Sequence, residues 1–254
     1  MRSELSEFSY GFAVTAELRD RLRPFIVTAP IFPTLVQEAE LGWDAKVPLR
    51  GLALFLQFKL AEALVRENAR EWSYFGGPYY RFPLHRRLRS NQHNRLKALA
   101  ATEPSVFYIA PRFHSLLEFH SNYIRESVAT DSAWIPVSNL PAIRDNDQHC
   151  IAFRTGVDAQ FFSPERKPVE GSIGGEEWLK RFPHLWESRG QPITSEWLFT
   201  LRSSLMRVLH ETDLFYELQF PAGREGLKPL LADVAYLART FFAAEFILVR
   251  EPSG

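Results

Sequence analysis

LALFLQFKL, residues 52–60, is the stretch that decides the predicted fold. It is an apolar run that only Gln57 and Lys59 interrupt. Side chains alternate between the two faces of a β-strand, so Phe55, Gln57 and Lys59 share one face and the residues at even positions face the other way. A polar side chain is costly on a buried strand unless it is paired or faces a functional cleft. The stretch therefore predicts a strand that presents an amide and an amine side by side.

A second strand is predicted just before this one. Residues 43–49, WDAKVPL, are rich in apolar and aromatic residues, and the Arg50-Gly51 pair between the two runs suits the tip of a hairpin. Asp44 would lie on the first arm. Twelve residues separate it from Gln57, which is about what two paired strands and a tight turn require. We therefore expect Asp44 to lie near Gln57 and Lys59.

Helical and strand patterns extend outward from this hairpin. Upstream, a helix is predicted over residues 5–22, followed by an extended segment and a turn within 25–42. Downstream, the patterns predict helices over 61–72 and 89–102, a short aromatic strand within 74–85, a buried strand over 105–110, a helix within 115–130 and a strand over 148–154. Residues 155–175 have the glycine and proline density of a loop or linker, and 176–249 are helical in pattern. These patterns divide the chain into a core, 1–165, and a mostly helical C-terminal extension, 166–254.

Composition limits the class of protein. The chain has 254 residues, of which 46% are hydrophobic and 24% charged, as is usual for a globular protein. Basic and acidic residues number 30 each, so any surface for a polyanion must be a local patch. One cysteine, Cys150, excludes an internal disulfide framework, and the lack of a Cys/His cluster argues against structural zinc. No apolar run is long enough to span a membrane, so we expect a cytoplasmic protein with no membrane partner.

The polar residues near the hairpin suggest metal chemistry. Hydrolysis of a phosphodiester by Mg²⁺ needs hard oxygen ligands and open positions for water and the phosphate. Asp44 would bind the metal, the Gln57 carbonyl would complete its shell, and Lys59 would orient water and stabilise charge on the phosphate. A second carboxylate is still needed. Glu38 is favoured, and the alternatives that remain open are Glu40, Glu17 and Glu7.

A basic stretch follows the proposed catalytic strand. Its candidate nucleic-acid contacts are Arg81, Arg86, Arg87, Arg89, Gln92 and Arg95. Guanidinium groups bind phosphates, and the aromatic residues interleaved with them can stack on bases. The alternative interpretation is a solvated basic face neutralised by nearby acids.

Asp44 followed by Gln57-x-Lys59 on the strand after a hairpin, with a helix before it, resembles the PD-(D/E)XK nucleases. The resemblance is to the variant in which glutamine replaces the second acidic residue, as in type IV restriction endonucleases and the nuclease domains of bacterial antiviral effectors. It covers roughly residues 5–115. It implies an α/β, restriction-endonuclease-like fold, in which a helix, a three-stranded antiparallel meander, a helix and a strand build a mixed sheet flanked by helices.

The resemblance also implies a function. We expect cleavage of DNA that depends on Mg²⁺ or Mn²⁺, by the effector subunit of an anti-phage defence or restriction system. A sensor or regulatory protein, a second copy of the chain, or both would be its partners. The alternative is a non-catalytic scaffold or nucleic-acid-binding subunit. An intact cluster beside an acidic ligand favours the enzyme, whereas a cluster splayed apart or plugged by arginine favours the scaffold.

Overall fold

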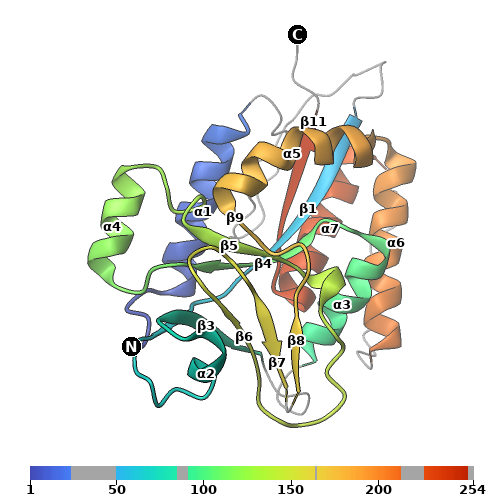
Figure 1. Cartoon of the computed structure of the whole chain (residues 1–254). Helices are drawn as coiled ribbons and strands as arrows, with labels where there is room; N and C mark the ends of the chain where they lie inside the picture. The colour runs from blue at the N-terminus through green and yellow to red at the C-terminus, as the bar shows by residue number, and fades with distance from the viewer. Residues whose placement is uncertain (24–49, 85–90, 164, 213–225, 251–254) are drawn as a thin grey trace.

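The computed structural model describes residues 1–23, 50–84, 91–163, 165–212 and 226–250. Within them the chain is mixed α/β, with two β-sheets and helices that cover both faces of the larger sheet (Figure 1). The larger sheet has the strand order β10-β1-β4-β5-β9, with β11 also paired to β1. Its strands are β1 (Arg50–Phe58), β4 (Val106–Pro111), β5 (Ser132–Pro136), β9 (Ile173–Gly174), β10 (Gln191–Pro192) and β11 (Glu245–Arg250).

Strand β1 is the centre of the larger sheet. Helix α3 (Gln92–Thr102) precedes β4 in the chain, and β4 pairs with β1 in parallel over residues 55–58 of β1. On the other side, β11 pairs with β1 antiparallel over residues 51–56. Because both edges of β1 are occupied and its residues from Leu52 to Phe58 are all buried, the apolar run of 52–58 forms an interior strand.

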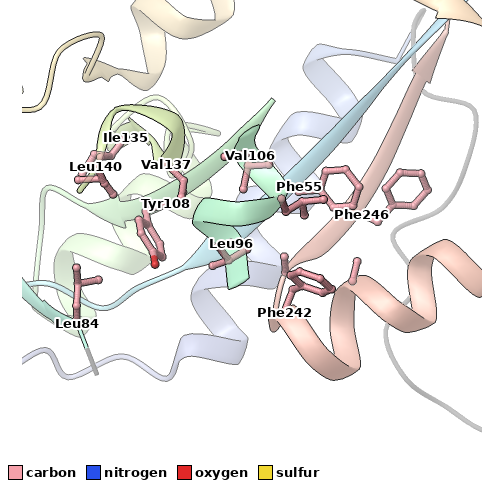
Figure 2. Packing of buried hydrophobic residues seen from close by; sticks show 14 of the residues in the cluster. Phe55, Leu84, Leu96, Val106, Tyr108, Ile135, Val137, Leu140, Phe242 and Phe246 are labelled. Carbon is pink, nitrogen blue, oxygen red and sulfur yellow. The ribbon is translucent and has the colours of Figure 1, made fainter. Parts of the chain in front are cut away.

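The residues of β1 alternate between two hydrophobic clusters. Ala53 and Phe55 face the cluster of α3, α6 (Ser195–Glu211) and α7 (Leu227–Phe242), part of which Figure 2 shows. Residues 52, 54, 56 and 58 face the cluster of α1 (Glu7–Arg21) and α5 (Gly175–Arg189). The predicted alternation of residues 54–58 is therefore confirmed, and it produces three layers, helix, sheet and helix.

A second, antiparallel sheet lies beside the face of the larger sheet that α3 covers (Figure 1). Its order is β2 (Glu62–Leu64), β3 (Tyr79–Leu84), β6 (His149–Phe153), β7 (Gln160–Phe162) and β8 (Arg166–Pro168). Two short helices, α2 (Trp72–Phe75) and α4 (Leu116–Ile124), complete the described elements together with a 3-10 turn at Val137–Asn139. Apolar residues of β3, β6 and β7 join the hydrophobic cluster that contains α3, α6 and α7. The two sheets therefore share one core.

Several expected elements are confirmed, namely α1 within 5–22, α3 within 89–102, β4 over 105–110 and β6 within 148–154. Others are wrong. Arg50-Gly51 is not a hairpin tip, because both residues lie inside β1 and pair with β10. Residues 61–72 form β2 and turns instead of a helix, and 155–175 contain β7, β8 and β9. The first arm of the expected hairpin, residues 43–49, lies outside the described residues.

The C-terminal segment contributes a strand to the larger sheet in addition to its helices. The apolar run 227–249 divides at Ala243, where α7 ends and β11 follows. Strand β11 then pairs with β1, and residues of α6, α7 and β11 join those of β1, α3 and β4 in one cluster. The ranges 1–165 and 166–254 therefore share a sheet and a core.

We expect Gly175→Ala to destabilise the fold. Helix α5 begins against the turn after α4, and a Cβ at Gly175 would lie 1.8 Å from the carbonyl oxygen of Ala129. Overpacking of this kind costs about 1–3 kcal/mol, which a urea unfolding curve would measure. Gly156→Ala is the control, because a Cβ there meets nothing within 4 Å. Equal stability of the two variants would contradict this tight contact.

Candidate active site at the carboxyl end of β1

A cleft of about 400 Å³ opens beyond the carboxyl end of β1. Four parts of the fold meet there, namely the first turns of α1, the end of β1, the start of α3 and the junction between α7 and β11. The lining residues are Glu7, Phe8, Gly11, Phe12, Gln57, Phe58, Lys59, Gln92, Arg239, Ala243 and Glu245. The two polar residues that interrupt the apolar strand, Gln57 and Lys59, thus lie together at one cleft, as their spacing predicts.

Gln57 is buried without full hydrogen bonding. Its side chain is 2% exposed, and its Oε1 atom has no hydrogen-bond partner among the described residues. A buried amide oxygen that accepts no bond is costly, typically by about 1–3 kcal/mol. The Gln57 oxygen is therefore available to accept a hydrogen bond or bind a cation at the cleft.

Lys59 follows β1 directly and is held in place by its backbone. Its N–H donates to the carbonyl oxygen of Ile109 on β4, at 2.9 Å, which continues the parallel pairing past the end of β1. Burial lowers the pKa of the Lys59 amine below its usual value, and the negative charge of Glu7 opposes that shift. The amine is thus a partly desolvated cation close to a carboxylate.

Glu7 reaches this cleft because α1 packs tightly on β1. Ser6 caps the helix by accepting the N–H of Ser9, which begins the helix at Glu7. Gly11 then lies against the ring of Phe58, where a Cβ would come within 2.7 Å of Cδ2. Burial raises the pKa of Glu7, and the charge of Lys59 opposes that rise.

A second charged pair borders the cleft. Arg239 Nη1 lies 3.4 Å from Glu245 Oε1, with exposed fractions of 24% and 12% for the two side chains. Ala243 makes the turn between them in a left-handed conformation, with φ of 48°, which is rare for a residue other than glycine. Burial raises the pKa of Glu245, and Arg239 opposes the rise.

A buried polar chain lies behind Lys59. The Lys59 Nζ atom is 5.8 Å from the centre of the Tyr108 ring, and the Tyr108 hydroxyl is 2.9 Å from His93 Nδ1. His93 Nε2 is 2.8 Å from the carbonyl oxygen of Pro141. Since that oxygen can only accept, neutral His93 donates from Nε2 and accepts a hydrogen bond from the Tyr108 hydroxyl at Nδ1. Burial lowers the pKa of His93 to about 4, so the ring is neutral near pH 7.

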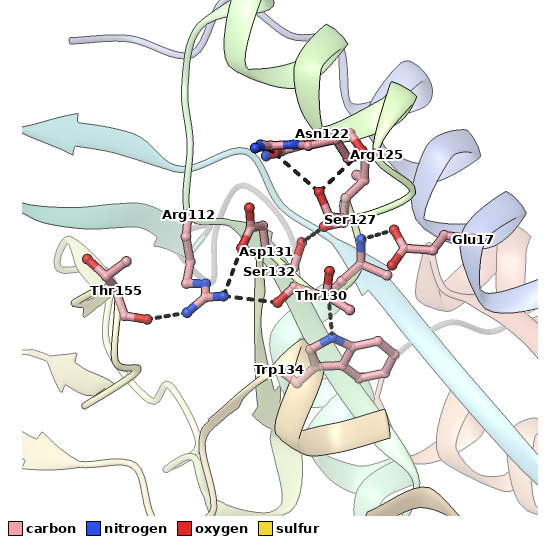
Figure 3. Close-up of polar contacts among 12 residues, drawn as sticks. Glu17, Arg112, Asn122, Arg125, Ser127, Thr130, Asp131, Ser132, Trp134 and Thr155 are labelled. Atoms are coloured by element: carbon pink, nitrogen blue, oxygen red, sulfur yellow. Dashed lines mark hydrogen bonds and ion pairs between the residues drawn. The ribbon is translucent and has the colours of Figure 1, made fainter. Parts of the chain in front are cut away.

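The structure describes two of the four candidate glutamates, Glu7 and Glu17, and places them differently. Glu7 lies at the cleft, whereas Glu38 and Glu40 lie outside the described residues, as does Asp44. Glu17 is buried elsewhere on α1 and accepts the N–H of Ala129 at 2.7 Å, in the polar network that Figure 3 shows.

The residues expected to contact nucleic acid also lie in different places. Gln92 lines the cleft as the first residue of α3. Arg81 on β3 pairs with Glu62 on β2 and with Glu71 before α2, and Arg95 donates to the carbonyl oxygen of Phe241. The remaining three, Arg86, Arg87 and Arg89, lie outside the described residues.

Arg239 and Glu245 are cleft residues that the sequence analysis did not identify. Glu245 is a polar residue beside the apolar residues of EFILV, as Gln57 and Lys59 are within LALFLQFKL. A polar residue at the end of an apolar strand was therefore the signal that could have identified it. That signal was lost because the whole run 227–249 has a helical pattern, which hides the strand within it.

The cleft residues include oxygen donors of the kind that Mg²⁺ takes. These are the carboxylates of Glu7 and Glu245 and the unpaired oxygen of Gln57. Among the described residues, no three His, Cys, Asp or Glu side chains gather into a set that could hold a metal. The described donors therefore fit part of such a site, and a further carboxylate would be required.

No family model, curated protein or solved structure matches the chain. None of the described helices combines the length and apolar character needed to cross a membrane.

Lys59→Met should stabilise the protein. Burial lowers the pKa of Lys59 even with Glu7 beside it, so the charged amine costs the folded state free energy that it does not cost the unfolded chain. Removing this charge should raise the free energy of unfolding by about 1 kcal/mol, as measured by urea unfolding. The control is Lys180→Met, because Lys180 is 65% exposed, and its effect should stay within about 0.5 kcal/mol. A less stable Lys59→Met protein would contradict the expected cost of this charge.

Acid should destabilise the fold through His93. Its folded pKa of about 4 lies below the ordinary 6.5, so the unfolded chain binds more protons between these values and stability falls as the pH falls. Between pH 7 and pH 5 this loss should be about 2 kcal/mol, and His93→Gln should remove it from the pH dependence. His120→Gln, on the exposed side of α4, should keep the full loss. Equal pH dependence in all three proteins would show that His93 is not buried in its neutral form.

Proposed function

We propose that this chain is a metal-dependent nuclease of the PD-(D/E)XK type, which hydrolyses phosphodiester bonds in DNA. The observation that carries the proposal is the meeting of Gln57, Lys59 and Glu7 at one cleft. Gln57 lies in the interior strand β1 and Lys59 follows it directly, and Glu7 comes from the helix before this strand. The αβ…αβ order of α1, β1, α3 and β4 supports a restriction-endonuclease-like core, with β11 in place of one antiparallel neighbour.

The donors divide into binding and positioning roles. Glu7 and the Gln57 oxygen would hold Mg²⁺ or Mn²⁺, together with Asp44, which is proposed from the sequence alone. The metal, when bound, supplies a Lewis acid for the phosphoryl oxygen and a more acidic water. Lys59 orients that water and offsets the charge that develops on the phosphate, and its partial burial strengthens this interaction.

The wider role is proposed from the resemblance. A defence or restriction effector would be kept inactive until a sensor or regulatory partner, or a second copy of the chain, activates it. Activity on RNA instead of DNA is a further outcome that the same cleft chemistry allows, because both carry the phosphodiester.

A second candidate is a non-catalytic scaffold or nucleic-acid-binding subunit. The observation that favours it is Arg239, which lies at the cleft in an ion pair with Glu245. A guanidinium beside Glu245 holds a positive charge where a nuclease would bind its metal, and it can bind a phosphate without cutting it. The presence of Glu7 beside Lys59 favours the enzyme.

Cleavage of plasmid DNA tests the two candidates. With Mg²⁺ or Mn²⁺, the wild-type chain should cut supercoiled DNA, and Lys59→Ala and Glu7→Gln should each lower the rate by about 100-fold or more. Asp44→Ala should do the same, and EDTA should stop all cutting. Lys180→Ala, remote on α5 and exposed, is the matched control that should cut normally.

Two results would go against the nuclease. Cutting that survives both Lys59→Ala and Glu7→Gln would place the activity elsewhere or in a contaminant. Metal-independent DNA binding without cutting, weakened by Arg239→Ala, would favour the binding subunit.

A further inference from the structure

Helix α4 presents an apolar face to solvent at the outer edge of the molecule (Figure 1). It has nine residues, and it carries four of the eleven exposed large apolar side chains of the described chain. Leu117 and Ile124 are 80% and 81% exposed, and Leu116 and Tyr123 are half-exposed. Apolar side chains that gather in this way mark an interaction site.

The opposite face of α4 is anchored to the rest of the fold. Ser115 and Glu118 form a capping box that fixes the first turn. Phe119 packs into the cluster of α1 and α5, and the buried Asn122 accepts a hydrogen bond from Arg125 at 2.6 Å. The exposed face therefore has a defined shape before any partner arrives.

The exposed apolar residues form pairs seven positions apart. Seven residues are close to two helical turns, so the members of a pair lie on one face, about 10 Å apart along the axis. Leu117 and Ile124 form the pair that points most directly outward. Leu116 and Tyr123 form a second pair along one side of the first. Each apolar residue thus has an apolar counterpart two turns away.

A charged pair with the same spacing follows the other side. Glu118 is negative and Arg125 is positive, and both are exposed. The hydrogen bonds that cap α4 use only Oε2 of Glu118, so its Oε1 atom accepts no hydrogen bond among the described residues. A cation on another molecule can therefore bind this carboxylate without breaking the cap.

This pattern is complementary to itself. A two-fold axis that relates two antiparallel helices sets residue 117 of one copy against 124 of the other, 116 against 123 and 118 against 125. The first two contacts are apolar, and the third joins opposite charges. We propose that α4 is the interface of a homodimer, in which it packs antiparallel on α4 of a second copy. The inference stands apart from the proposed nuclease function, because none of these residues lines the cleft.

The length of α4 sets the expected strength of the dimer. Nine residues span only about 14 Å, which is short for a standard protein interface. We therefore expect a reversible dimer with a dissociation constant in the micromolar range.

Sedimentation over a wide range of protein concentrations measures the association. Wild-type chain should pass from monomer to dimer, and Leu117→Glu should weaken the dimer by about 100-fold or more, because each interface then buries two carboxylates among apolar side chains. Tyr236→Glu is the matched control. Tyr236 is 50% exposed on α7, which covers the other face of the larger sheet, and its variant should dimerise like wild type. Equal thermal unfolding of the monomers checks that both substitutions leave the fold intact.

Glu118→Gln tests the charged contact by itself. Glutamine can replace glutamate in a capping box, so the helix should keep its first turn. The dimer should weaken by about fivefold. Added salt should weaken the wild-type dimer and leave that of the variant almost unchanged.

Cysteine crosslinking tests the antiparallel register. A mixture of Leu117→Cys and Ile124→Cys chains should form a disulfide on mild oxidation faster than either variant alone, because only the mixed pair brings the two Cβ atoms close together. Wild-type chain, whose one cysteine is Cys150, is the control.

Three results would overturn the proposal. The first is a chain that stays monomeric at every concentration, and the second is a dimer that Leu117→Glu leaves unchanged. The third is a monomeric chain that binds vesicles of phosphatidylcholine and phosphatidylglycerol and loses this binding in Leu117→Glu, which would assign the apolar face to a lipid surface. Faster crosslinking of each cysteine variant with itself would contradict the antiparallel register.

Discussion

The burial of β1 on both faces and along both edges is the constraint on which the rest depends. A strand in this position can carry polar side chains only where the sheet ends, because elsewhere they would face a hydrophobic cluster. Gln57 and Lys59 lie at that end, where α1 and the α7–β11 turn leave a cleft. The position of the site is therefore set by the packing of one strand. The chemistry of the cleft in turn depends on the charged groups of Glu7, Lys59 and Glu245, which the fold partly removes from water.

The sequence predicted what local patterns determine. Alternation in LALFLQFKL placed Gln57 and Lys59 on one face, and the helix over 89–102 and the strand over 105–110 followed from periodicity and flanking prolines. The sequence favoured Glu38 and left Glu7 among the alternatives, because nothing in a helical pattern says which turn reaches a particular strand. In the structure the packing of Gly11 against Phe58 brings Glu7 to the cleft, whereas Glu38 and Glu40 lie outside the described residues.

Long-range pairing could not be predicted in the same way. Sequential strands often pair, so the sequence favours the adjacent residues 43–49 as the antiparallel neighbour of β1. In the structure β11 occupies one edge, and it comes from a run whose apolar residues also fit a helix. Glu245 and Arg239 were missed for this reason. Asp44, Glu38 and the arginines of 86–89 lie outside the described residues and stay predictions.

The pairing of β11 with β1 also has a consequence for synthesis. Residues 51–56 leave the ribosome long before their partners at 245–250, so β1 must wait for most of the chain before that edge is covered. The cleft is completed in the same step, because Arg239 and Glu245 flank the turn into β11. A chain shortened before this strand would keep Gln57 and Lys59 but lack one wall of the site. The order of translation thus delays assembly of the site until nearly all of the described chain has been made.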